Sequence, residues 1–306
     1  MRHWVLAVGL GVVLVLGGAG QLVAAQWKWQ DDYLFKAEVC YLPESDMKGD
    51  RGRVSVGRVF AEGYVPLSSK GEVLSWGLRP KVEVWSLSWD GLGQRTLANG
   101  TNISSADMPS RLWGVDLAGW GTYALSKATY IYAEAGVSVT SDMEDISTDD
   151  MSLITLAFAG HSFSPAFELL LGAGYNQALG RGQVYPLLGV RWIFAEGWAL
   201  DVLLPAHATL RWQFAPGLEA GVEFATQGGD YRLSESRPWC NAIATWQQMT
   251  LGPYVQIGVG GLMIRVSAGY SFERKLEIHS DGFNQKLLEY EPDDGVVFAL
   301  QAYWPI

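Results

Sequence analysis

Charged side chains recur at alternate positions within apolar stretches of the second half of the chain. If these stretches are β-strands, a two-residue period puts the charged side chains on one face and the apolar ones on the other. An isolated charge in an enclosed interior costs several kcal/mol, so we expect opposite charges on neighbouring strands to lie together. The residues predicted to face an enclosed lumen in this way are Arg191, Asp201, His207, Arg211, Glu219, Glu223, Arg265 and Glu273.

These lumen residues admit two interpretations. In one, they form a salt-bridged plug that keeps a narrow barrel closed. In the other, they form a charged ring that selects solutes in a small pore. Both interpretations place the same side chains inside a closed sheet.

A catalytic interpretation is weaker. The best candidate is the segment from His161 to Ser164, but Ser162 falls on the opposite strand face and Ser164 is three residues away. A histidine activates a nucleophile only within hydrogen-bonding reach, so this spacing fails in a regular strand. His207 does share a face with Thr209, but threonine in mid-strand is a poorer nucleophile. We expect no enzymatic activity.

Two acidic segments, 142–150 and 289–294, could offer oxygen ligands to a cation, but their spacing matches no defined calcium loop. We predict solvated charged loops, and no metal site or cofactor. The formal net charge of −10 disfavours nucleic acid as a partner, because nucleic acid requires a basic surface.

The elements that position these residues follow from the alternation, which is clearest in residues 262–275. There an apolar face and a polar face alternate over a dozen residues, longer than the usual strand of about 5–6. A tilted strand that crosses a bilayer needs about 9–11 residues. The same pattern, with varying strength, marks fourteen candidate strands: 33–42, 52–63, 80–90, 112–124, 128–140, 151–161, 166–177, 186–194, 197–204, 207–214, 217–228, 243–259, 262–275 and 295–304.

The connections between these strands alternate between short turns and longer polar loops, as in outer-membrane barrels with periplasmic turns and extracellular loops. Two connections depart from this scheme. Residues 64–79 are long where a turn is expected, and 205–206 are short where a loop is expected. We therefore predict an all-β, closed antiparallel up-and-down transmembrane β-barrel of about 12–14 strands.

The chain begins with the features of a signal peptide. Arg2 precedes an apolar run, and small residues end the segment at Ala25, so we predict a signal peptide over 1–25 and one barrel domain over 26–306. Export would place Cys40 and Cys240 in an oxidising compartment, where one disulfide could form.

Aromatic residues near the predicted strand ends fit the two girdles that flank the apolar band of a membrane barrel. These are Trp192, Trp198, Trp212, Trp246, Trp304, Tyr175 and Tyr270.

The patterns at 189–192, 198–205, 210–214 and 228–232 resemble those of bacterial outer-membrane β-barrel proteins. The resemblance is closest to a barrel family defined as a domain of unknown function, and more distant to barrels of aromatic-degradation operons. It implies the barrel fold and the outer-membrane location. The partners expected there are outer-membrane lipid, lipopolysaccharide and the outer-membrane assembly machinery, with an unidentified small solute. We expect a narrow channel or passive transport barrel, or alternatively a non-conducting barrel that acts through its extracellular loops.

Overall fold

The computed structural model describes residues 33–49, 52–70, 73–97, 101–179, 181–234, 238–239 and 241–305. The predicted signal peptide and Cys240 lie outside the described residues, so the leader and the Cys40–Cys240 disulfide stay predictions. Cys40 itself is buried. None of the described helices is long and apolar enough to cross a membrane.

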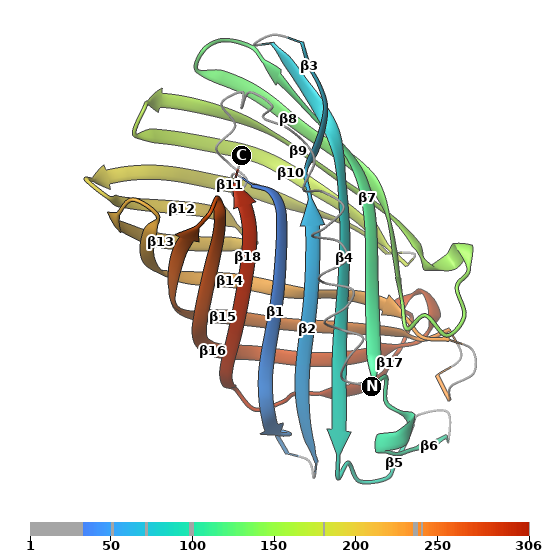
Figure 1. Ribbon diagram of the computed structural model, residues 1–306. Helices are drawn as coiled ribbons and strands as arrows, with labels where there is room; N and C mark the ends of the chain where they lie inside the picture. The colour runs from blue at the N-terminus through green and yellow to red at the C-terminus, as the bar shows by residue number, and fades with distance from the viewer. Residues whose placement is uncertain are drawn as a thin grey trace.

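Within the described residues, fourteen strands pair side by side into a closed antiparallel wall (Figure 1). In chain order they are β1 (Tyr33–Asp46), β2 (Arg53–Gly63), β4 (Leu74–Asp90), β7 (Arg111–Ala124), β8 (Thr129–Ser141), β9 (Met151–Ser164), β10 (Phe167–Ala178), β11 (Arg181–Ala195), β12 (Trp198–Leu204), β13 (His207–Ala215), β14 (Leu218–Arg232), β15 (Ile243–Val259), β16 (Leu262–His279) and β18 (Gly295–Pro305).

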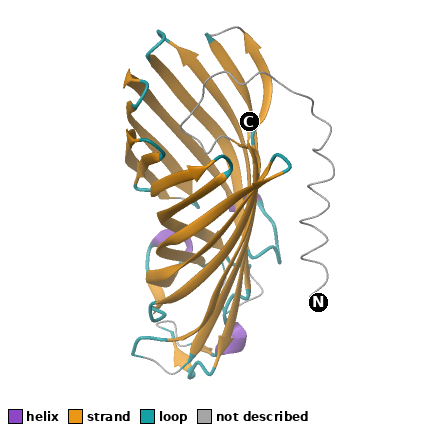
Figure 2. Cartoon of the chain, turned by 60° about the vertical axis from the view of Figure 1, so that its left-hand side comes forward, coloured by secondary structure: helices purple, strands orange, loops and turns teal. Residues whose placement is uncertain are grey.

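The smaller elements lie beside this wall or in the loops. They are β3 (Val65–Lys70), β5 (Arg95–Thr96), β6 (Asn102–Ile103), β17 (Lys286–Tyr290) and the 3-10 turns η1 (Ser105–Asp107), η2 (Thr148–Asp150) and η3 (Asp281–Phe283). Figure 2 shows the helical turns in the connections and none within the wall.

The wall closes where the first strand pairs with the last. Val39 of β1 lies opposite Leu300 of β18, and β18 continues the sheet to β16. Closure leaves no strand edge among these elements, which is what a barrel needs where lipid offers no hydrogen bonds. The prediction of a closed antiparallel barrel is confirmed, at the upper end of its strand range.

The two irregular connections have a structural explanation. Residues 64–79 contain no long turn, because β3 extends the line of β2 and pairs with the first part of β4. Residues 205–206 are indeed a short turn between β12 and β13, which register directly with each other. Both ends of the described wall lie at one end of the barrel, together with the turns 125–128, 165–166, 196–197, 216–217 and 260–261, and this is called here the turn end. The opposite end, which also holds the 205–206 turn, is called the loop end.

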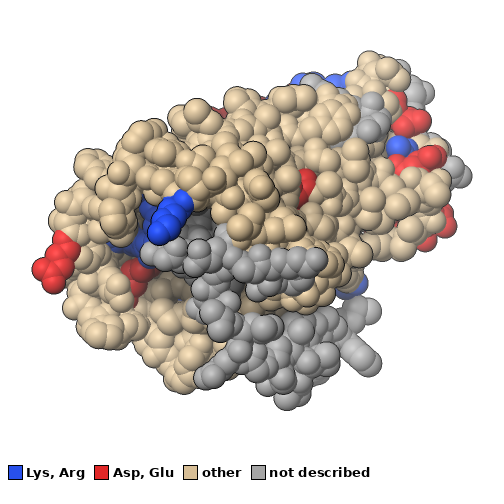
Figure 3. All heavy atoms as spheres, turned by 90° about the horizontal axis from the view of Figure 1, so that it is seen from above, with Lys and Arg blue, Asp and Glu red and all other residues tan. Residues whose placement is uncertain are grey.

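The outer face of the wall is apolar. Many large hydrophobic side chains there are exposed, such as Leu117, Leu171, Val266 and Phe298. Charged side chains are sparse over this surface, and acidic ones gather toward one end of the molecule (Figure 3). At the turn end, Trp198 stacks on Trp212 with ring centroids 5.6 Å apart.

Six of the seven predicted girdle aromatics are consistent with an outward position, but Trp246 is not. Trp246 is fully buried inside the barrel, since it shares the inward parity of Tyr254 and Gln256 on β15. Its ring lies 6.0 Å from that of Trp85 on β4, a strand that is not its neighbour in the sheet.

This contact is the centre of a large apolar cluster that fills one side of the loop end. The cluster joins β1, β2, β4 and β7 to β14, β15, β16 and β17 across the lumen, and the loops contribute Leu97, Met108 and Trp239. Opposite walls of the barrel therefore pack against each other as the two sheets of a sandwich do.

A polar latch holds the walls together beside this cluster. Arg232 at the end of β14 forms a parallel bridge to Ser141 of β8, although the two strands are far apart in the sheet order. Its guanidinium lies 3.5 Å from Asp150 and 3.2 Å from Asp281. The backbone amide of Ser234 donates to Asp142. The predicted acidic segment 142–150 thus anchors one wall to the other.

The latch predicts unequal effects for substitutions of Asp150 and Arg232. Burial raises the pKa of the Asp150 carboxyl above its ordinary value, so its charged form gains little from the nearby arginine. Asp150→Asn should therefore change latch stability by less than about 1 kcal/mol, whereas Arg232→Ala should cost about 3 kcal/mol by leaving buried partners unpaired. Hydrogen exchange of the 142–150 amides measures the difference; equal exchange in the two variants would contradict it.

Candidate functional site: the charged lumen

Six of the eight predicted lumen residues form one continuous ladder of alternating charge. Arg191 Nε lies 3.6 Å from Asp201, and Asp201 lies 2.9 Å from Arg211 Nε on the next strand. Arg211 Nη1 is 3.7 Å from Glu219, which continues the ladder onto β14. The prediction that neighbours of opposite charge would pair across the sheet is confirmed for these residues.

The ladder ends at Arg265 on β16. Its guanidinium lies 2.8 Å from Glu223 and 3.9 Å from Glu219. It also donates to the side-chain carbonyl of Gln256 at 3.0 Å and lies over the ring of Tyr254. The Tyr254 hydroxyl donates to Glu219 at 2.7 Å. Each charge of the ladder therefore has an opposite charge within reach.

Strand register produces this arrangement. Arg191 is the direct cross-strand partner of Asp201, and Gln256 that of Arg265. Directly opposed side chains on one face of an antiparallel pair lie close enough to interact. Arg211 is diagonal to Asp201 and Glu219, and Arg265 reaches over β15 to the two carboxylates of β14. Register therefore makes the contacts as far as Glu219, and the length of the arginine side chain completes the ladder.

Two predicted members lie outside the ladder. Glu273 is wrong as a lumen residue: it is exposed, with a left-handed backbone (φ 49°) beside a register shift between β15 and β16. The extra residue of this bulge reverses the alternation, so Arg274 faces the interior instead and is buried. His207 begins β13 beside the 205–206 turn, at the loop end and half-buried.

A second charge network, which the sequence interpretation missed, lines the opposite side of the lumen. Arg58 on β2 pairs with Glu38 on β1 at 2.7 Å and with Glu83 on β4. Lys81 joins Glu83 to Asp116 on β7, at 3.4 and 3.3 Å. The sequence does contain the pattern, because on each strand these charged residues occupy positions that face the interior. The apolar positions of the early segments alternate less regularly, so the inward face is harder to recognise there.

A third group lies nearer the turn end. Arg79 bridges Glu62 on β2 and Glu134 on β8, and the Tyr132 hydroxyl donates to Glu134 at 2.9 Å. Gln301 of β18 donates to Glu38 at 2.7 Å. Because Gln301 is the cross-strand partner of Arg265, it brings the missed network next to the ladder.

The two sides of the lumen differ in access to water. Glu38 and Glu83 have side chains 7% exposed, and Arg58 11%. In the ladder, Asp201 is 27% and Arg211 31% exposed. The charges around Arg58 are therefore sealed from water, while Asp201 and Arg211 border accessible space. Exposure also varies within each network, since Lys81 is 25% exposed and Glu219 and Arg265 are 10% exposed.

Between these sides, the lumen face of β8–β11 is largely aromatic and aliphatic. Tyr132 stacks on Phe158, with centroids 4.8 Å apart, and both pack with Leu170 and Leu187. Leu203 and Tyr185 border this cluster. The interior thus combines a buried apolar wall with a ladder of paired charges.

The residues of the rejected catalytic candidate lie apart. His161 is exposed, and its Nδ1 lies 2.8 Å from the Thr129 hydroxyl. Ser162 has the opposite strand parity, as the spacing predicted. Among the described residues, no group of three or more His, Cys, Asp or Glu side chains is arranged to hold a metal ion.

The sequence of this chain matches one protein family over most of its length. The model of the family described as a domain of unknown function (DUF6268) matches residues 21–301. The chain belongs to this family. The predicted resemblance to a barrel family of that kind is confirmed. No curated relative matches the chain.

This chain is similar, at low sequence identity, to several solved bacterial proteins. The β domain of the Bordetella autotransporter BrkA is 12% identical, with 90% of this chain and 100% of that chain covered and a TM-score of 0.32. The translocator domain of NalP from Neisseria meningitidis is 10% identical, with coverages of 97% and 93% and a TM-score of 0.35. The toluene transporter TodX from Pseudomonas putida is 10% identical, with 88% of each chain covered and a TM-score of 0.33.

The buried charges around Arg58 predict a large stability effect. Arg58→Ala leaves the buried Glu38 without its cation and Glu83 with Lys81 alone, and should cost about 3 kcal/mol of unfolding free energy. Arg53 provides a matched control on the same strand, because it also pairs with two acids, Glu44 and Asp90, but at the surface. Arg53→Ala should cost less than about 1 kcal/mol. Urea titration of the barrel in lipid vesicles, followed by tryptophan fluorescence, measures both; equal costs would contradict the sealed arrangement.

Proposed function

We propose that this DUF6268 protein is a bacterial outer-membrane barrel that lets a small polar solute pass along the β11–β14 side of its lumen. Asp201 and Arg211 border the passage, and the charge ladder lines it. The observation that carries this proposal is the exposure of Asp201 and Arg211, which at 27% and 31% are the most exposed of the paired lumen charges described above.

The membrane location is supported by the outer face. Exposed apolar side chains project from alternate positions of strands that are long enough to cross a bilayer, and tryptophans gather at the turn end. The predicted signal peptide would direct the chain out of the cytoplasm. In this location the turn end faces the periplasm and the loops face the exterior.

The protein should therefore require detergent to remain monodisperse after extraction and should migrate faster on a gel before heating than after. It should also be recovered with the outer-membrane fraction. A chain that stays monodisperse in plain buffer would refute the membrane location.

The ladder also suggests the kind of passage. Its three arginines face three carboxylates, so a solute meets no net charge there. A passage lined by balanced charges should discriminate little between small anions and cations. Size and polarity then limit passage more than charge sign does.

Asp201→Asn tests this mechanism directly. It leaves Arg191 and Arg211 without their shared carboxylate, so the passage gains positive charge. In planar bilayers, wild type should give small unitary steps with weak ion preference, and Asp201→Asn should raise the anion-to-cation permeability ratio roughly twofold or more.

Glu196→Gln is the matched control, since it removes a carboxylate of the exposed β11–β12 turn and leaves the lumen unchanged. Selectivity should follow Asp201 alone. An identical shift in both variants would contradict a passage beside the ladder.

A non-conducting barrel that acts through its loops is the second candidate. The apolar cluster that fills one side of the loop end favours it, because that half of the lumen has a packed interior. Silence in the bilayer at high protein load, with the fold intact, would favour this second function.

The proposal includes no catalysis. His161 and Ser162 lie on opposite faces of β9, which supports this part of it. Lipid or peptide turnover that is lost in His161→Ala would overturn it.

A further inference from the structure

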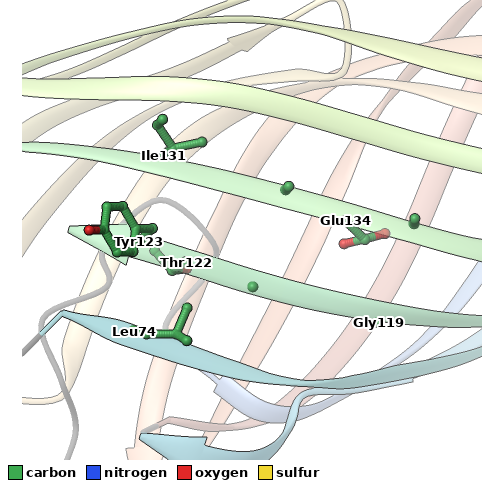
Figure 4. Close-up of a pocket in the computed structure, with 9 residues that line it drawn as sticks. Leu74, Gly119, Thr122, Tyr123, Ile131 and Glu134 are labelled. Atoms are coloured by element: carbon green, nitrogen blue, oxygen red, sulfur yellow. The ribbon is translucent and has the colours of Figure 1, made fainter. Parts of the chain in front are cut away.

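The lipid-facing wall contains a groove that the passage through the lumen does not use. Its volume is about 370 Å³, and residues of β4, β7 and β8 line it near the turn end. The positions that form it are small: Gly119 lies opposite Ala135, and Gly121 opposite Ala133. Figure 4 shows Leu74, Tyr123 and Ile131 on the three strands around these positions.

The groove is hollow because of these small residues. The wall beside it carries large exposed side chains, including Trp76, Leu78, Leu117 and Val137. A Cβ added at Gly119 or Gly121 would approach no neighbouring atom closer than 3.8 Å. The glycines are therefore not required there by packing within the protein, and the space outside them is available.

We propose that this groove holds one acyl chain of a glycerophospholipid of the periplasmic leaflet. The inference rests on the proposed membrane location and orientation. In hydrocarbon, such a hollow is filled by whatever packs best, since van der Waals contact rather than water exclusion drives association there.

The dimensions suit an acyl chain. Gly119 to Tyr123 span about 13 Å along the strand, at about 3.3 Å per residue. A volume of 370 Å³ equals about a dozen water molecules of roughly 30 Å³, and a methylene group is of similar size. Leu74, Tyr123 and Ile131 are cross-strand partners, so they form one row of projecting side chains that bounds the hollow toward the turn end. A hollow that holds about a dozen methylene groups suits a single acyl chain.

The charge at the turn end suits the head group. Lys127 is exposed in the 125–128 turn that joins β7 to β8, the two strands that form the groove. An acyl chain seated between Gly119 and Tyr123 would bring its head group toward this turn, where an ammonium attracts a phosphate.

The test compares lipid retention in variants that fill the groove. The full barrel is reconstituted in nanodiscs of phosphatidylethanolamine and phosphatidylglycerol, extracted in detergent, and weighed intact by native mass spectrometry. Wild type should retain about one phospholipid. The double variant Ala133→Leu/Ala135→Leu extends two exposed side chains into the groove and should retain about tenfold less, with unchanged heat-modifiable migration.

Two further variants sharpen the test. Ala268→Leu/Ala302→Leu makes the same change at outward positions of β16 and β18, strands that do not adjoin the groove, and should retain lipid as wild type does. Lys127→Gln should lower retention about fivefold while leaving the groove open, as expected for one cation near a phosphate.

Three outcomes would overturn the inference. Equal retention in wild type and the groove-filling variant would show that no lipid sits there. A dimer that only the groove-filling variant disrupts would assign the groove to a second copy. After extraction from native membranes, retained lipopolysaccharide that the groove-filling variant loses would assign it to the opposite leaflet. Failure of lipid retention in a detergent-dependent, heat-modifiable barrel would leave the proposed channel intact, whereas a barrel that is monodisperse without detergent would remove the premise of both.

Discussion

The constraint on which the structure depends is that a closed wall of fourteen strands encloses more space than a layer of side chains would fill. Eight strands leave an interior that side chains just occupy, and sixteen or more leave an aqueous channel. With fourteen strands, this barrel lies between these two sizes, and its opposite walls come into contact at the loop end. The β8–β14 bridge and the Trp85–Trp246 contact divide the interior into a packed side and an accessible side.

The interior charges follow from the same constraint. Where the walls approach, Arg58 is placed between Glu38 and Glu83 of the neighbouring strands, whereas the buried Arg274 donates to Ser45 and to the backbone carbonyl of Asp293. Such a pair is costly to break but adds little stability over an apolar packing, so its value lies in holding a polar interior in one arrangement. On the accessible side, Arg211 and Asp201 keep the same pairing but border water-accessible space.

Much of this could be predicted from the sequence, because a period of two residues identifies strands and their faces together. All fourteen candidate segments correspond to strands, and residues 243–259 coincide with β15. The ladder from Arg191 to Glu219 also follows from parity and from direct or diagonal neighbours in the register. Alternation, however, says nothing about which strands meet across the lumen, so the burial of Trp246 against Trp85 could not be predicted. It also fails where a bulge inserts a residue, as at Glu273, and where one strand continues another, as β3 continues β2.

The contact between Trp85 and Trp246 has a consequence for the order in which the molecule is built. The two residues belong to strands far apart in the chain, and the apolar cluster around them also needs β16 and β17. Contacts of such sequence separation form late, because a long loop must close first. The apolar cluster is therefore incomplete, and open to water, until the last strands have paired. We expect the loop end to close at the same step as β18 pairs with β1.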